Sequence, residues 1–126
     1  EAVRIYPSYA EAYYNLGFAC QLQRKLEKAV EYYYKAIRFM PDNTPAYNNL
    51  GLVLYQQGKV MEALDTYRNG LKAMPENLNL HYNFGILLEK QGRRDEAIKE
   101  LRAALQIDPN SAKVRKKLST VLKEQN

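Results

Sequence analysis

Residues that bind metals or form disulfides are almost absent from this chain. It has one cysteine, Cys20, and one histidine, His81, among 126 residues. A lone cysteine cannot form an internal disulfide, and two such residues are too few for a zinc site with the usual ligands. We therefore expect no metal site and no cofactor, and we interpret His81 as a packing residue.

Long apolar runs are also missing. No stretch approaches the roughly 18 apolar residues of a membrane-spanning helix, so we expect no insertion into a membrane. The chain opens at Glu1 without an initiating methionine, and no basic segment followed by an apolar one is visible as a secretory signal. We expect it to be a segment of a longer protein, and its localisation stays open.

Net positive charge is scarce until the C-terminal end. The net charge is +5, yet residues 1–111 hold 14 basic and 13 acidic residues, whereas residues 112–126 hold five and one. A terminal helix with a charged, solvated face explains this, and the same charge could steer an acidic partner. Because no aromatic residues alternate with the lysines, we expect no nucleic-acid binding. The candidate electrostatic patch consists of Lys113, Lys116 and Lys117.

Prolines show the organisation of the chain. Pro7, Pro41, Pro75 and Pro109 are separated by a constant 34 residues. A fixed period of this length is typical of a supersecondary unit stacked on copies of itself. Such a stack offers a long surface rather than an enclosed pocket, and no nucleophile is paired with a base here. We therefore predict a protein that is not an enzyme.

Each unit of the period predicts two helices. In the first helix, a glycine (Gly17, Gly51, Gly85) follows a large apolar residue, and an aromatic residue or histidine lies three positions before that residue. Glycine inside a helix costs about 1 kcal/mol relative to alanine, so we expect a neighbouring helix too close for a Cβ atom. In the second helix, an alanine at the predicted crossing is followed by a large residue, in the pairs Ala29 and Tyr33, Ala63 and Tyr67, and Ala97 and Leu101.

The turns between these helices are polar. Gly58 and Gly92 suit the left-handed residue that ends a helix, whereas the first unit has Arg24 at the same place. If Arg24 adopts a positive φ, the strain is roughly 1 kcal/mol. Proline then ends each second helix.

Together, the period, the glycines, the alanines and the prolines resemble the tetratricopeptide repeat family over nearly the whole chain. The resemblance implies an all-α, right-handed α-solenoid of helix-turn-helix repeats. Departures are few: Tyr13, Tyr47 and His81 stand where tryptophan is frequent, and Gly70 replaces an alanine.

We divide residues 1–126, as a single domain, by this period. Residues 1–9 are predicted to be the tail of a preceding repeat, and residues 10–43, 44–77 and 78–111 form three repeats. Residues 112–126 form a C-terminal capping helix that covers the third repeat. We expect four apolar side chains to make this contact: Val114, Leu118, Val121 and Leu122. The four lysines of this helix are expected to face water: Lys113, Lys116, Lys117 and Lys123.

In this family, the first helices form the inner wall of an arc. One asparagine per repeat should face it: Asn15, Asn49 and Asn83. A carboxamide offers both a donor and an acceptor to a peptide backbone, and the file resembles the asparagine ladder of O-linked N-acetylglucosamine transferases. Alternatively, these amides only bond neighbouring helices. The other candidate peptide-binding residues are Tyr14, Asn48, Tyr55, Asn79 and Tyr82. For Phe18, Leu52 and Ile86 we favour packing between first helices.

Family members that grip the C-terminal carboxylate of a chaperone imply a narrower function. They use lysine and asparagine on the first repeat, asparagine on the second, and lysine with arginine on the third. The matching positions here are Tyr14, Phe18, Asn49, Asn79 and Asn83, so one of five agrees. Without the cations a buried carboxylate is poorly paired, and we do not expect this mode.

We therefore predict a non-catalytic protein-protein interaction scaffold that binds an extended peptide segment of a partner on its concave face. One alternative is a substrate-presenting segment of a larger, glycosyltransferase-like enzyme. Another is a self-associating module, because apolar surface around Tyr9, Ala12 and Tyr13 is expected to be open at the N-terminal edge. The partner would then be a second copy of the chain, in a homo-oligomer.

Overall fold

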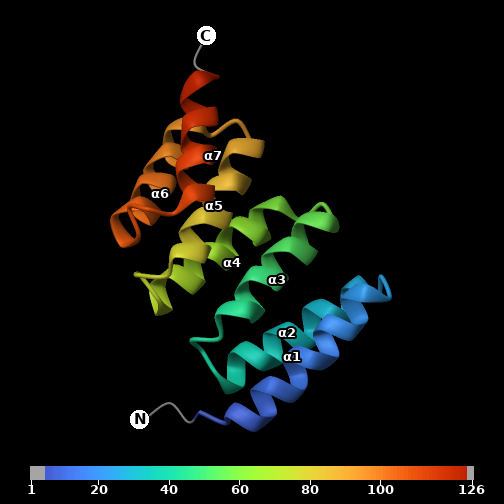
Figure 1. Cartoon of the computed structure of the whole chain (residues 1–126). Helices are drawn as coiled ribbons and strands as arrows, with labels where there is room; N and C mark the ends of the chain where they lie inside the picture. The colour runs from blue at the N-terminus through green and yellow to red at the C-terminus, as the bar shows by residue number, and fades with distance from the viewer. Residues whose placement is uncertain (1–4, 125–126) are drawn as a thin grey trace. The chain divides into compact units, whose positions relative to one another are not determined.

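The computed structural model describes residues 5–124, which form seven α-helices and no strands (Figure 1). The first-helix positions of the period correspond to α1 (Pro7–Leu22), α3 (Thr44–Gln56), α5 (Leu78–Lys90) and α7 (Ala112–Lys123). The second-helix positions correspond to α2 (Leu26–Phe39), α4 (Val60–Ala73) and α6 (Arg94–Ile107). No helix among these residues combines the length and the apolar character that crossing a membrane requires.

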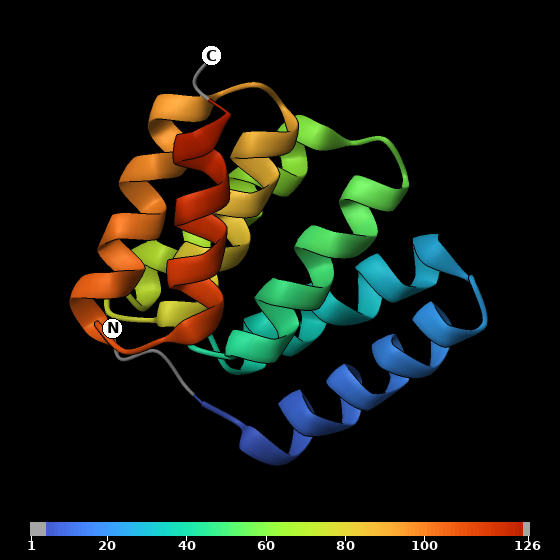
Figure 2. The same ribbon diagram turned by 45° about the horizontal axis from the view of Figure 1, so that its top comes forward.

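The chain forms two compact units, of which the first ends at Ala73 and the second begins at Met74. In the first unit, α1 packs against α2, α2 against α3, and α3 against α4. In the second unit, α5 packs against α6 and α6 against α7. Figure 2 shows α1 and α2 running antiparallel on either side of a short turn, as a helix-turn-helix repeat requires.

The three helix-interior glycines lie where helices cross closely, as the sequence predicts. A Cβ atom on Gly17 would lie 2.8 Å from the ring of Tyr33, and one on Gly51 would lie 2.5 Å from the ring of Tyr67. At Gly85 the nearest atom belongs to Leu101, at 3.1 Å. Because real Cβ atoms essentially never approach closer than 3.0 Å, the first two positions exclude a side chain unless the tyrosine moves.

Turn geometry also follows the sequence. Gly58 and Gly92 have φ angles of 79° and 76°, and Arg24 has a φ of 63°. Arg24 therefore carries the left-handed strain of roughly 1 kcal/mol that glycine avoids. Each second helix ends two residues before its proline, at Phe39, Ala73 and Ile107.

The N-terminal boundary differs from the prediction. Residues 1–4 lie outside the described range, Ile5 and Tyr6 are not helical, and α1 begins at Pro7. Residues 7–9, which the period assigns to a preceding repeat, thus form the first turn of α1. At the repeat position of Tyr9, the later repeats have asparagines whose side chains accept hydrogen bonds from the Ala46 and Leu80 amides. Tyrosine cannot cap in this way, whereas proline suits the first position of a helix.

Helix α7, predicted to be a capping helix, packs part of its apolar face against α6. Val114 and Val121 are fully buried in a cluster with Ile98 and Leu101 of α6. Leu118 is half-buried, and Leu122 is 37% exposed. Leu118 also packs against this cluster, so three of the four apolar side chains make the predicted contact with α6.

Candidate functional site

In the first unit, α1 and α3 bring the predicted residues Tyr14 and Asn49 together. The Asn49 Nδ2 atom donates a hydrogen bond of 2.8 Å to the hydroxyl oxygen of Tyr14. Asn49 therefore bonds a neighbouring helix, as one of the two sequence interpretations holds. The Tyr14 hydroxyl accepts this bond and so keeps its own proton for another acceptor.

Two buried tyrosines, Tyr33 and Tyr67, contact predicted site residues of the first unit. Tyr33 is fully buried, and its ring lies 5.7 Å from that of Tyr14. Burial is the main cause that raises the pKa of Tyr33, and the neighbouring Tyr14 adds to it. Burial also raises the pKa of Tyr67 to about 12, and its hydroxyl donates to the Asn48 carbonyl at 3.5 Å. Both hydroxyls are therefore protonated donors near neutral pH.

Apolar side chains beside these groups face outward. Phe18 and Leu52 are each 43% exposed, and Ile86 is half-buried. Each of these two side chains therefore leaves much of its surface open to solvent, and packing between first helices stays a prediction. The ring of Phe18 is stacked on Tyr14 at 6.3 Å and 12°, so one face of Phe18 is supported while the side chain stays accessible. Asn15 is exposed, and Asn48 and Tyr55 are half-buried.

In the second unit, the ammonium group of Lys113 on α7 lies beside two predicted site residues of α5, Asn79 and Tyr82. Lys113 Nζ donates to Asn79 Oδ1 at 2.9 Å and lies 4.8 Å from the ring centroid of Tyr82. The electron-rich face of a tyrosine attracts an ammonium group at this distance. Asn83 and Tyr82 are half-buried on the same helix. Sequence reasoning treated Lys113 as part of a separate patch, although Asn79 and Lys113 stand 34 residues apart and so share a repeat position.

Lys117 does not face water as predicted. Its ammonium group is paired with Glu89, and the two side chains are 26% and 16% exposed. The hydrogen bond from Lys117 is the main cause that lowers the pKa of Glu89. Lys116 is exposed. The predicted three-lysine patch is therefore divided, because two of its members contact α5.

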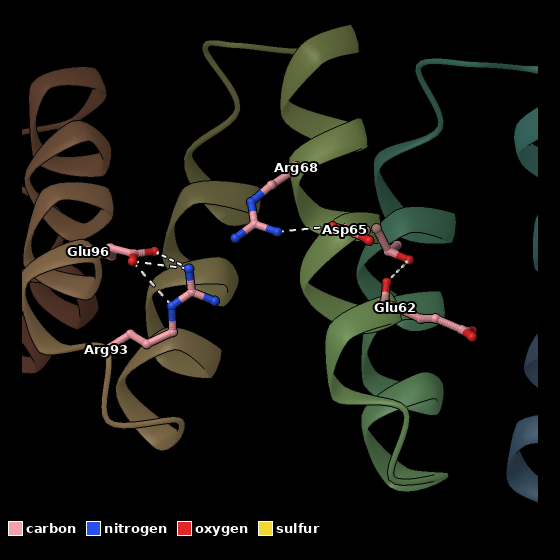
Figure 3. Close-up of polar contacts among 6 residues, drawn as sticks. Glu62, Asp65, Arg68, Arg93 and Glu96 are labelled. Carbon is pink, nitrogen blue, oxygen red and sulfur yellow. Dashed lines mark hydrogen bonds and ion pairs between the residues drawn. The ribbon is translucent and has the colours of Figure 1, made fainter.

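Other ion pairs are peripheral to these groups. Figure 3 shows Arg68 with Asp65 on α4, and Arg93 with Glu96 at the start of α6. Both are local, exposed pairs three residues apart in sequence, of the kind that contributes little to stability.

His81 lies largely buried between helices, as expected for a packing residue, and also makes polar contacts. Its Nδ1 atom lies 2.8 Å from Glu100 Oε1, and its Nε2 atom lies 2.8 Å from the Pro75 carbonyl oxygen. It thus links α5 to α6 and to the preceding turn by polar contacts. Among residues 5–124, no three histidine, cysteine, aspartate or glutamate side chains gather as a metal site would require.

Comparisons with known proteins agree with this architecture. Family models described as tetratricopeptide repeat match residues 10–43 and 48–112. No curated protein matches the sequence.

Several solved structures share the fold. The first TPR of Spaghetti (RPAP3) bound to the HSP90 peptide SRMEEVD is 16% identical, with a TM-score of 0.83 and coverage of 98% of each chain. The first TPR domain of human RPAP3 is 18% identical, with a TM-score of 0.81 and coverage of 94% of this chain and 93% of that one. The Arabidopsis OM64 TPR domain is 20% identical, with a TM-score of 0.77 and coverage of 93% and 97%.

At these identities the solved structures show the fold alone. The all-α helical-repeat solenoid predicted from the sequence is confirmed by them and by the seven helices. One family model by itself spans more than half of the chain. With its glycines at the helix crossings and its prolines after each second helix, the chain belongs to the tetratricopeptide repeat family.

Proposed function

We propose that this chain is a non-catalytic protein-interaction module that binds an extended peptide segment of a partner on the concave face, along its first helices. The observation that carries the proposal is the accessible row on α1 and α3. There, Phe18 and Leu52 are exposed beside Tyr14 and an asparagine of each helix. Tyrosine is enriched at interaction hot spots, and here the ring of Tyr14 is stacked on that of Phe18.

The polar groups of this row suit a peptide backbone. Because Asn49 donates to Tyr14, the Tyr14 proton is available to a peptide carbonyl. Asn15 is exposed and offers both a donor and an acceptor. Asn49 serves chiefly to orient Tyr14, so the three asparagines do not act as an even ladder.

The second unit, taken by itself, offers a cation to a partner. Its ammonium group, held by Asn79 and Tyr82, attracts an acidic side chain or a carboxylate of the partner. The solved neighbour that carries the HSP90 peptide SRMEEVD supports a peptide partner in general. Only one of the five carboxylate-gripping positions matches in this sequence, so a chaperone C-terminus is not the partner that we propose.

Selection from a displayed library of random peptides, followed by affinity measurement on the selected peptides, tests the proposal. We expect Phe18→Ser/Leu52→Ser to weaken binding by about tenfold or more, because each side chain contributes on the order of 1 kcal/mol or more. Met61→Ser is the matched control, since Met61 is 64% exposed on the second helix α4. Peptides that bind the site variant as tightly as the unchanged chain would contradict the proposal.

A second candidate function is self-association through α1. Tyr9 is 59% exposed and Leu16 is 46% exposed on this helix. Sedimentation over a range of concentrations tests this candidate. If the chain self-associates through α1, it forms a dimer that Leu16→Lys abolishes. A monomer at all concentrations excludes self-association.

A further inference from the structure

A second recessed surface lies in the first unit, at the turns between its helices. Both views of the fold show the α1–α2 turn and the α3–α4 turn at the same side of this unit (Figures 1 and 2). Between them is a cavity of about 670 Å³, which is the size of a small-molecule site. Its lining comes from both turns: Arg24, Lys25, Leu26, Glu27, Lys28, Gln57 and Lys59.

Cations dominate this lining. Four of the seven residues are basic, and Glu27 is the only acidic one. None of the four basic side chains forms an ion pair with a carboxylate in the part of the chain that the structure describes. A group of unpaired cations around one cavity is a feature that an anion would complete.

Backbone donors point to the same ligand. The residue that precedes α2 is Lys25, which forms no side-chain cap on this 14-residue helix. The first-turn residues Leu26, Glu27 and Lys28 all line the cavity. Free N–H groups at a helix start and the positive end of the helix dipole bind anionic oxygens. The lysine side chains therefore reinforce a site that the backbone already favours.

Two further residues are left unexplained by folding alone. Arg24 has a φ of 63° at the position where the other repeats have glycine, so its side chain is kept there despite backbone strain. Gln57 has a buried side-chain oxygen without a hydrogen-bond partner.

From these contacts we propose that the cavity binds a phosphate monoester. Arg24, Lys25, Lys28 and Lys59 neutralise the phosphate, and the first-turn amides of α2 donate to its oxygens. Glu27 opposes binding, because it is the one carboxylate on the wall.

The test is an NMR titration of the full chain with inorganic phosphate, followed by a phosphoserine peptide and its unphosphorylated twin. We expect saturable shifts of the Leu26, Glu27 and Lys28 amides, which weaken as salt is raised. Lys28→Gln and Lys59→Gln should each weaken binding by about three- to tenfold. Glu27→Gln should strengthen binding, which loss of structure cannot do.

Arg24→Gly is the sharpest variant, because it is expected to raise the unfolding temperature while lowering phosphate affinity. Lys72→Gln is the matched control, since Lys72 is exposed on α4 outside the cavity lining and its loss changes the net charge equally. A phosphopeptide that binds more tightly than inorganic phosphate identifies a phosphorylated protein as the ligand, and equal affinities identify a free phosphate. Absence of saturable shifts, or equal affinity in Lys28→Gln, Lys59→Gln and Lys72→Gln, overturns the proposal.

Discussion

The first helices of the first two repeats, α1 and α3, carry the same motif in different surroundings. Leu50 of α3 is 1% exposed, whereas Leu16, at the same motif position in α1, is 46% exposed. Ala46 is fully buried and its counterpart Ala12 is exposed. The difference follows from α2, which packs against α3, while no described helix covers the corresponding face of α1. At the motif position of Leu16 and Leu50, the side chain therefore becomes part of the core where a preceding helix covers it.

The largest expected effect is a direct test of this comparison. Leu50→Ala should destabilise the first unit by about 2–5 kcal/mol, because it leaves a cavity in packed surroundings. Leu16→Ala should cost less than about 1 kcal/mol, because the side chain is already half in water. Urea unfolding followed by circular dichroism measures both. Equal losses would show that a further helix or a second copy covers α1 in solution.

Glycine substitutions should give the next largest effect. Gly17→Ala forces a Cβ atom into the fully buried ring of Tyr33, and overpacking of this kind costs about 1–3 kcal/mol. The higher helix propensity of alanine offsets about 1 kcal/mol of this loss. Gly85→Ala meets the flexible side chain of Leu101 at 3.1 Å, so we expect it to be close to neutral. Unfolding midpoints that show a larger loss of stability for Gly85→Ala than for Gly17→Ala would contradict the closer helix crossing at Gly17.

The first two repeats also differ in how the N-terminal ends of their first helices, α1 and α3, are capped. Asn43→Ala should cost about 1 kcal/mol, because the Asn43 oxygen accepts from the Ala46 amide at 3.2 Å. In α1, Ser8→Ala should change little, since Ser8 is exposed and the N-terminal residue of that helix has no side-chain cap. Thermal unfolding of both variants gives the comparison. A larger loss for Ser8→Ala would mean that α1 has a cap of its own.

The smallest expected effect has the opposite sign. Arg24→Gly should stabilise the chain by about 0.5–1 kcal/mol, because glycine adopts a positive φ without strain but gains entropy in the unfolded state. Gly58→Arg, in the second repeat, should destabilise by a similar amount. Urea midpoints should therefore move in opposite directions, and movement in the same direction would exclude backbone strain as the cause.

The fold was predictable because its signals are local and recur every 34 residues. Gly17 and Gly51 mark the crossings, and Pro41 and Pro75 mark the helix ends, whatever the neighbouring side chains do. The start of α1 was missed because one substitution, Tyr9 for asparagine, removes a cap. The division into three repeats and a capping helix remains a prediction from the period.

The candidate site was less predictable, because its contacts join different helices. The Asn49 bond to Tyr14 and the Lys113 bond to Asn79 span 35 and 34 residues. The amino-acid sequence does not show which side-chain rotamers bring such groups together. The exposure of Phe18 and Leu52 likewise depends on how neighbouring first helices pack. The role of these residues in binding remains a proposal.

Within each unit, helices contact only helices that are adjacent in the chain or next but one to it. Contacts over such short sequence separations close small loops, and chains rich in them fold in microseconds to milliseconds. During synthesis, the pair formed by α1 and α2 is complete by Phe39, with most of its contacts already available. The chain can therefore gain structure one pair at a time as it leaves the ribosome, without waiting for its C-terminal residues.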